Sequence, residues 1–323
     1  MAVGEVSNQA AVPMVNTKRS RFAKQQERLA YILLTPTLIL ILVVAAWPLY
    51  KAVALSFTNE RLGRPGAAEY IGLENYETLL WRVRERSDGS TRIGDSDFYA
   101  AVKNTLILTF ASVALETLIG LGVALVINSK FKGRGLMRTA VLVPWAIPTV
   151  VSAQMWSWMY NDVFGVFNDM LQKTGIISSP IAWLANPTTA LMAIVAMEVW
   201  KTTPFMALLL LAGLQIIPGD IYEAADIDGA SPMQQFLALT LPLLRPAILV
   251  ALIFRTMDAL RIFDAVKVMT NGGSGTEVMS TYGYRNLFDF QKLGYGNAIS
   301  VIIFFIIAVF VVVYMTSIKV EEL

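Results

Sequence analysis

The sequence predicts an all-α integral membrane protein with six transmembrane helices. Hydrophobic residues make up 55% of its 323 positions, charged residues only 15%, and the mean hydropathy is +0.56. Soluble domains carry about 25% charged residues, so this composition is typical of a membrane protein. Six apolar runs are each long enough to cross a bilayer as a helix, which takes about 20 residues. Because lipid offers no hydrogen bonds to the backbone, we expect these runs to be helices.

These runs divide the chain into a tail and a transmembrane domain. The first run, about residues 29–50, lies between Arg28 and Lys51. It is too long and too poor in small residues for a cleaved secretory signal, so we expect it to stay as an anchor. The other five runs are expected at about residues 104–128, 139–160, 188–214, 246–268 and 297–318. Residues 1–28 then form an N-terminal tail, and residues 29–323 form the transmembrane domain.

Short basic segments predict the orientation of these spans, because Lys and Arg are enriched in cytoplasmic loops. The basic residues before the first span, and those between the second and third, are Lys18, Arg19, Arg21, Lys24, Arg28, Lys130, Lys132, Arg134 and Arg138. With six spans, both termini are therefore expected in the cytoplasm and residues 57–101 outside. The net charge of +2 does not indicate nucleic-acid binding, since the basic residues gather beside membrane spans.

A polar stretch between the fourth and fifth spans, residues 218–245, is predicted to form two short helices joined by a tight bend. Asp220 is a good N-cap for the first helix, and Gly229 can end it in a left-handed conformation. Ser231, Pro232 and Gln234 then have the spacing of an N-cap, a first helical residue and a capping-box partner. Span counting places this stretch in the cytoplasm.

The first of these short helices contains Glu223, Ala224 and Ala225. The two small side chains would let another protein surface approach closely, and Glu223 offers a charge for that surface to bind. An ordinary amphipathic surface helix is the alternative interpretation.

The residue types present exclude most catalytic chemistry. The chain has no Cys and no His, so it lacks thiol chemistry and the commonest metal ligand and acid–base group. No Gly-Lys pair followed by Ser or Thr occurs, so a Walker A nucleotide site is missing. We therefore expect no enzyme activity, no metal site and no cofactor in this chain.

The fourth span carries two charged side chains in an otherwise apolar helix. Glu198 and Lys201 are one turn apart, and Thr202 and Phe205 share their face. Charges inside a membrane are costly and usually line a pathway or pair with each other. Hydrogen-bonding groups beside an aromatic ring suit a disaccharide, whose hydroxyls and ring faces need both. The alternative is a Glu198–Lys201 ion pair that only stabilises the helix bundle.

The fifth span carries charges of alternating sign at steps of three residues: Arg255, Asp258, Arg261 and Asp264. Such a ladder predicts pairing within the helix and towards neighbouring helices, although direct contact of Arg255 with a substrate stays open. Glu116 is alone in the second span; it either pairs with one of these arginines or is protonated, and the sequence leaves both open. Gln154 in the third span is a further candidate polar contact.

Several of these stretches resemble one protein family. Glu223-Ala224-Ala225, followed at fixed spacing by Gly229 and Leu241-Pro242, resembles the EAA loop of permease subunits in bacterial ATP-binding-cassette (ABC) importers, and residues 218–245 are called the EAA loop below. Residues 133–148 are similar to the start of the third span in maltose- and trehalose-type carbohydrate permeases. Residues 72–76 and 269–273 resemble two external elements of the same permeases, except that Ser274 stands where Pro is usual.

The resemblance covers nearly the whole chain after the tail, and residues 198–205 and 254–264 are most similar to the first permease of a trehalose or related disaccharide importer. It implies the type I (MetI-like) permease fold with a cytoplasmic EAA coupling helix. The residues that it implies for ATPase coupling are Glu223, Ala224, Ala225, Asp228 and Gly229. Those for the substrate pathway are Glu198, Lys201, Thr202, Phe205, Arg255 and Ala259, with Asp258 and Gln154 as further contacts. Those for docking a binding protein are Asn271, Gly272 and Gly273.

The resemblance also implies partners and a location. A second permease would complete the pathway, an ABC ATPase dimer would bind ATP and Mg, and an extracytoplasmic sugar-binding protein would deliver the substrate. The chain would lie in the bacterial cytoplasmic (inner) membrane, in contact with its lipid. An ion-coupled secondary transporter would also explain buried Glu116, Glu198 and Asp258, but it leaves the EAA loop unexplained. A membrane-embedded enzyme would need a catalytic set that the sequence lacks.

Overall fold

The computed structural model describes residues 21–64, 66, 68–85 and 91–317, so the predicted tail lies outside the described residues up to residue 20. The chain divides into two compact units, residues 1–51 and 52–323. The described residues of the first unit form one uninterrupted helix made of α1 (Arg21–Ile41), the wider turns of η1 (Leu42–Ala46) and the start of α2 (Trp47–Ser56). Residues Gln25–Ser56 are long and apolar enough to cross a membrane. This helix includes the whole of the first predicted run.

The second unit contains four more helices that are long and apolar enough to cross a membrane. They are α4 (Ser96–Asn128), α8 (Pro187–Ile216), α11 (Leu241–Ala259) with the turns before it, and α14 (Leu293–Ser317). The third predicted run is divided into α5 (Arg134–Ala146) and α6 (Thr149–Met159), which bend by 87° at the break. With that pair counted as one crossing, the described residues contain six apolar segments, which confirms the predicted all-α membrane fold.

The break between α5 and α6 has a local cause. Ile147 is extended, with φ −75° and ψ 133°, and Pro148 follows it. A residue before proline is pushed out of the helical conformation, and proline has no N–H to continue the hydrogen-bond ladder. The third predicted run, residues 139–160, is therefore not a straight helix.

The second and fifth runs also differ from their predicted bounds. α4 begins at Ser96 rather than near residue 104, because the Asp95 carboxylate caps it. α11 ends at Ala259, where Arg261 and Ile262 make tight backbone bonds to the third residue before them. The short α12 (Asp264–Met269) follows separately, so residues 246–268 do not form one helix.

The core of the second unit is α4 packed along α8, with α5 and α11 against α8. Two glycines allow these close approaches. A Cβ at Gly120 of α4 would lie 2.9 Å from Cγ of Met206, and one at Gly213 of α8 would lie 2.3 Å from Cβ of Ala247 on α11. Small residues at helix contacts are typical of membrane proteins, since association there depends on close packing.

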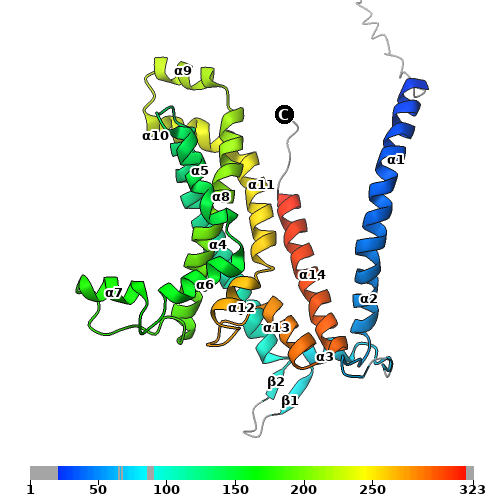
Figure 1. Cartoon of the computed structure of the whole chain (residues 1–323). Helices are drawn as coiled ribbons and strands as arrows, with labels where there is room; N and C mark the ends of the chain where they lie inside the picture. Colours follow the sequence, from blue (N-terminus) through cyan, green and yellow to red (C-terminus); the bar gives the residue numbers. More distant parts are fainter. Residues whose placement is uncertain (1–20, 65, 67, 86–90, 318–323) are drawn as a thin grey trace, which may run out of the picture. The chain divides into compact units, whose positions relative to one another are not determined.

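The short elements of the second unit lie at its two ends (Figure 1). One end carries α9 (Gly219–Ile227), α10 (Pro232–Gln235) and the π-helical turns of η2 (Phe236–Thr240), which all lie within the EAA loop. The opposite end, called the hairpin end here, contains the elements α3 (Glu74–Leu80), β1 (Val83–Glu85), β2 (Thr91–Ile93), α7 (Val166–Lys173), α12, α13 (Met279–Tyr284) and η3 (Arg285–Asp289). β1 and β2 pair antiparallel, with Val83 opposite Ile93.

Candidate functional site

A buried cluster of charges lies where α4, α8 and α11 meet, and Arg255 of α11 is its centre. Arg255 donates two hydrogen bonds to Glu116 of α4, from Nε to Oε2 and from Nη2 to Oε1. It also contacts Oε2 of Glu198 on α8 at 3.2 Å and Oδ2 of Asp258 at 2.7 Å. Arg255 is 2% exposed and Glu116 is fully buried, whereas the side chain of Asp258 is 68% exposed. Of the two possibilities for Glu116, the structure shows pairing with an arginine.

A hydroxyl completes the cluster. Thr202 Oγ1 lies 2.7 Å from Oε1 of Glu116 and 2.6 Å from the backbone oxygen of Glu198. Hydrogen bonds to ionised groups are the strong ones, and buried charges are tolerated only when such bonds surround them. Glu116, which is itself fully buried, therefore accepts two hydrogen bonds from Arg255, and the single hydroxyl proton of Thr202 is shared between Glu116 and the Glu198 carbonyl.

Lys201 does not pair with Glu198, so the alternative interpretation, a Glu198–Lys201 ion pair that only stabilises the bundle, is wrong. Its Nζ instead donates to the carbonyl oxygen of Ile147, at the end of α5, over 2.6 Å. Two physical reasons account for this. The carboxylate of Glu198 is taken by Arg255, and the carbonyl of Ile147 lies past the last turn of α5, where the helix itself provides no donor.

A pocket of about 480 Å³ opens beside this cluster, and it is called the Arg255 pocket below. Its lining contains six of the residues predicted for the substrate pathway: Glu198, Lys201, Thr202, Arg255, Asp258 and Ala259. The rest of its wall comes from the α5–α6 break and from the turn after α11: Trp145, Ala146, Ile147, Pro148, Thr149, Arg261, Ile262, Phe263 and Asp264. Binding pockets for small molecules have volumes of about 300–1,000 Å³, so this one is of a suitable size.

Two predicted residues do not line this pocket. Phe205 stacks on Trp145, with ring centroids 5.9 Å apart and the planes 19° apart, so it supports a wall residue from behind. Gln154 is exposed on α6, outside the lining. The wall residues of the α5–α6 break were not predicted, although Pro144 and Pro148 on either side of Trp145 were a signal for an irregular helix.

The predicted charge ladder is only partly continuous. Arg255 and Asp258 pair within α11, but the helix ends before Arg261 and Asp264. Both residues still line the pocket, from the turn after α11 and from the start of α12.

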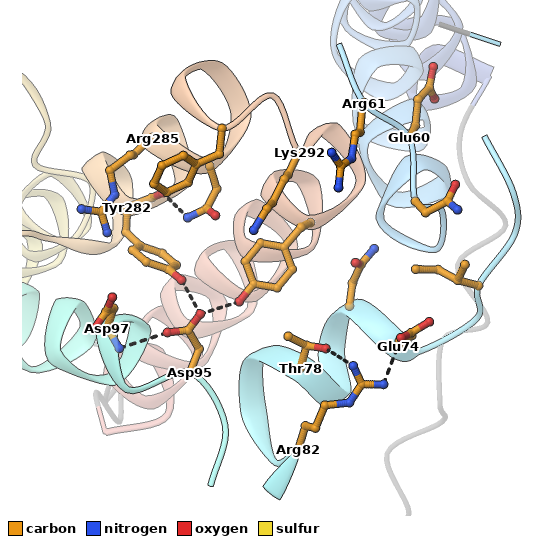
Figure 2. A pocket seen from close by; sticks show the side chains of 16 residues that line it. Glu60, Arg61, Glu74, Thr78, Arg82, Asp95, Asp97, Tyr282, Arg285 and Lys292 are labelled. Carbon is orange, nitrogen blue, oxygen red and sulfur yellow. Dashed lines mark hydrogen bonds and ion pairs between the residues drawn. The ribbon is translucent and has the colours of Figure 1, made fainter. Parts of the chain in front are cut away.

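A second pocket, of about 770 Å³, lies at the hairpin end and is lined almost entirely by polar side chains (Figure 2). Asp95 organises one side of it, since its Oδ2 accepts hydrogen bonds from Tyr282 at 2.5 Å and Tyr295 at 2.8 Å. Burial would raise the pKa of Asp95, but the hydrogen bonds from both tyrosines and from the start of α4 hold it below its usual value. On the other side Arg82 pairs with Glu74 at 3.0 Å.

This larger pocket contains none of the predicted pathway residues. Its carboxylate Asp95 is already satisfied, and it joins α4, α13 and α14. Nearby, Glu277 pairs with Arg285 at 2.7 Å. Burial raises the pKa of Glu277 to about 7 even though Arg285 acts in the opposite direction. We therefore interpret this pocket as part of the framework of the hairpin end.

The EAA loop folds largely as the sequence predicted. Gly229 has φ +76°, and Ser231 and Gln234 form the capping box that starts α10. The predicted N-cap Asp220 is wrong, because the N-cap of α9 is Pro218, two residues earlier, and Asp220 lies in the first turn of the helix. Gln235 Nε2 donates to Asp226 Oδ1 at 2.6 Å, which joins α9 to the chain after the bend.

The residues predicted for coupling lie together on α9 and at its end. Glu223 and Ala224 are exposed, Ala225 is buried, and Asp228 and Gly229 are exposed at the C-terminal end of the helix. Glu223 and Ala224 are therefore free to contact another protein.

The residues predicted for docking form a tight turn at the hairpin end. Asn271 and Gly272 have φ +53° and +75°, and Asn271 and Gly273 are exposed. The turn is anchored by Asn104 of α4, whose Nδ2 donates to the carbonyl oxygens of Gly275 and Glu277.

Known proteins resemble this chain over most of its length. The family described as binding-protein-dependent transport system inner membrane component matches residues 116–320. The chain is 42% identical over 306 residues to the trehalose/maltose transport system permease protein MalF of Thermococcus litoralis, covering 94% of this chain and 97% of that protein. It is 39% identical over 309 residues to the trehalose transport system permease protein SugA of Mycobacterium tuberculosis, covering 96% and 94%.

A solved structure shows the same fold. A chain in the crystal structure of a bacterial ABC transporter involved in the import of the acidic polysaccharide alginate superposes with a TM-score of 0.76 at 25% identity, covering 94% of this chain and 100% of that one. The buried charge cluster and the EAA loop of the present chain lie within residues 116–320, which the family model matches. The chain belongs to the family of binding-protein-dependent transport system inner membrane components, the permease subunits of ABC importers, which transport solutes and are not enzymes.

Proposed function

We propose that this chain forms one half of the membrane pathway of an ABC importer for a neutral, hydroxyl-rich sugar, with trehalose or a related disaccharide as the first choice. A second permease would provide the other half, an ABC ATPase dimer would bind ATP and Mg, and an extracytoplasmic binding protein would deliver the sugar. In this arrangement the chain lies in the cytoplasmic membrane with both termini and the EAA loop in the cytoplasm.

The observation that carries this proposal is the composition of the Arg255 pocket. Carboxylate, guanidinium, ammonium and hydroxyl groups line it next to the rings of Trp145 and Phe263. Sugar hydroxyls both donate and accept hydrogen bonds, while the faces of sugar rings pack against aromatic side chains. Two relatives that match over more than nine-tenths of this chain are named for trehalose or maltose transport.

The charges of the pocket favour a neutral ligand over an anion. The lining carries three formal positive charges, on Lys201, Arg255 and Arg261, and three negative ones, on Glu198, Asp258 and Asp264. Glu116, buried against Arg255, adds one more negative charge, so the pocket has no excess of positive charge to attract a sugar acid. The alginate importer is described as transporting an acidic polysaccharide, and on this argument its substrate class does not extend to the present chain.

α8 connects the pocket to the EAA loop. It contains Glu198 and Lys201, ends at Ile216, and α9 starts three residues later at Gly219. The eighteen helical steps from Glu198 to Ile216 span about 27 Å, which is most of the thickness of a bilayer core. A force applied to α9 by a partner would therefore reach the pocket through one helix. An ion-coupled transporter, the alternative, gives the EAA loop no role.

The test is sugar-stimulated ATPase activity of the complete importer reconstituted in lipid. The complex would contain both permeases, the ATPase and the binding protein, and the panel would include trehalose, maltose, a glucuronic-acid disaccharide and an alginate oligosaccharide. We expect stimulation by a neutral disaccharide and none by the acidic sugars. Stimulation by the acidic sugars alone would contradict the proposed substrate class.

Glu223→Ala tests the coupling part of the proposal. We expect this variant to insert normally and to lose stimulation, because α9 would lose the charge that the ATPase binds. Asp169→Asn on α7 is the matched control, since it removes an exposed carboxylate at the hairpin end. Equal activity of Glu223→Ala and the control would refute the role of α9.

A further inference from the structure

The wall of the Arg255 pocket contains the break between α5 and α6, and one side chain from another helix donates a hydrogen bond to the backbone at that break. Lys201 of α8 donates from Nζ to the carbonyl oxygen of Ile147 at 2.6 Å. Pro148 comes next and has no N–H, and α6 starts at Thr149 in a new direction, 87° from α5. This bond therefore joins α8 to the point at which the chain turns.

Lys201 makes no ion pair of 4.0 Å or less within the part of the chain that the structure describes, although Glu198 and Asp258 lie near enough to act on its charge. Among the ion pairs there, Glu198 and Asp258 both pair with Arg255. An ammonium group has three donors, and Ile147 uses one of them. The C-terminal end of α5 also carries a partial negative charge, which favours a cation at this point. Lys201 is only 7% exposed, so it is held at the pocket wall and does not extend into solvent.

We propose that Lys201 is a positioning residue that holds the bend between α5 and α6, and that a sugar hydroxyl entering the Arg255 pocket inserts into its bond with the Ile147 carbonyl. The inference rests on the proposed function and extends it, because it links occupancy of the pocket to the shape of its wall. When the hydroxyl inserts, the wall is no longer held directly by α8.

Insertion selects for the chemistry of a hydroxyl group. A hydroxyl accepts a hydrogen bond from Nζ of Lys201 and donates one to the carbonyl of Ile147, so neither group is left unpaired. A carboxylate or a fluorine atom can accept from Lys201 but cannot donate to Ile147. The carbonyl would then lose its partner inside a buried wall, which is unfavourable. The same bond thus holds the bend and discriminates against ligands that cannot donate.

The experiment compares Lys201→Met and Lys201→Arg in the reconstituted importer. Monodeoxy and deoxyfluoro analogues of the stimulating sugar are assayed for the concentration that gives half-maximal ATPase stimulation. With Lys201 present, we expect one analogue position at which fluorination raises this concentration about ten- to a hundredfold, the effect of one hydrogen bond to a charged group, while deoxygenation raises it less because the direct Lys201–Ile147 bond is then kept. In Lys201→Met that penalty should disappear, and Lys201→Arg should keep most of it. A penalty of the same size in Lys201→Met would overturn the insertion step.

The bend is tested separately by labelling, because the chain has no cysteine of its own. A Thr149→Cys reporter lies in the pocket wall, and Thr174→Cys at the end of α7 is an exposed control away from it. Without sugar, we expect a soluble maleimide to label Thr149→Cys faster in Lys201→Met than in Lys201→Arg, and Thr174→Cys equally in both. Equal labelling of Thr149→Cys would overturn the role of Lys201 in holding the bend.

The two assays distinguish failure of this inference from failure of the proposed function. If no sugar stimulates the ATPase of the unmodified complex, the substrate assignment is wrong, while the labelling of the sugar-free protein still reports on the bend. If a sugar stimulates but neither assay depends on Lys201, the positioning role is wrong and the substrate assignment stands. A lysine that only stabilises the bundle would change thermal stability alone, without changing the analogue profile.

Discussion

Replacing Arg255 should destabilise the protein more than any other single change at the cluster. Arg255→Met removes the only cation that contacts Glu116 and Glu198 among the described residues, and both carboxylates are buried. Breaking a buried ion pair by removing one partner costs about 3–5 kcal/mol, because the remaining charge has no compensation. We therefore expect Arg255→Met to fold poorly or to lose most of its stability.

The structure indicates how this loss divides among the three carboxylates. Glu116 receives two hydrogen bonds from Arg255 and is fully buried, so it should account for most of the effect. Glu198 makes one longer contact, of 3.2 Å. Asp258 is 68% exposed at its side chain, and an exposed pair contributes only about 0–1 kcal/mol. Asp258→Asn is therefore the matched control and should be nearly neutral.

The assay is thermal unfolding of purified variants in lipid nanodiscs, combined with a double-mutant cycle. A loss of 3–5 kcal/mol corresponds to a fall in the melting temperature on the order of 10 °C. Adding Glu116→Gln to Arg255→Met should restore much of this fall, since the uncompensated charge is then removed. If Arg255→Met melts within a degree or so of Asp258→Asn, or if Glu116→Gln makes the double variant worse, the reasoning is refuted.

Two further predictions concern the hairpin end. Burial raises the pKa of Glu277 to about 7, so the folded protein favours the neutral carboxyl. The free energy of unfolding should therefore be highest below pH 4.5, the ordinary Glu value, and fall by about 3 kcal/mol at most as the pH rises through 7. Melting curves from pH 5 to 8 should show this loss, which Glu277→Gln should abolish and the exposed Glu74→Gln should not. Gly294→Ala should destabilise by about 1–3 kcal/mol or more, since its Cβ would lie 1.9 Å from the carbonyl oxygen of Thr58. Gly135→Ala, which meets no atom within 4 Å, should be tolerated, and equal melting temperatures of these two glycine variants would contradict the packing argument.

The long apolar helices and the EAA loop could be predicted because their signals are local. Apolar runs, a capping box and a helix-ending glycine each lie within a few residues of the structure that they determine. Where a local sequence pattern was compatible with two structures, the prediction was wrong. Asp220 is a suitable cap by residue type, but Pro218 precedes it and starts the helix earlier. The break after Ala146 had a signal in Pro148, yet its direction depends on how α5 and α6 pack against α8.

The partners of the buried charges could not be predicted from spacing alone. Within a helix, residues three or four apart are neighbours, so Glu198 and Lys201 were reasonable partners. The structure instead brings Arg255 to Glu116, which is 139 residues away in the sequence, and Lys201 to a backbone carbonyl 54 residues away. A guanidinium can contact several carboxylates at once, whereas an ammonium is a single point charge. This difference favours Arg255 as the centre of the cluster.

The positions of the small residues explain why Arg255 can reach both carboxylates. Gly120 lies one turn after Glu116 on α4, and it contacts α8 at Met206, one turn after Thr202. The lack of a side chain there lets α4 approach α8 closely beside the cluster, which matches the 2.7 Å bond from Thr202 to Glu116. Gly213 of α8 allows the same close approach to α11. Its contact there is Ala247, which lies two turns before Arg255 on α11. A larger residue at either glycine should therefore separate the helices and lengthen the ion pairs, so that a packing change distant from the pocket would weaken the charge cluster in it.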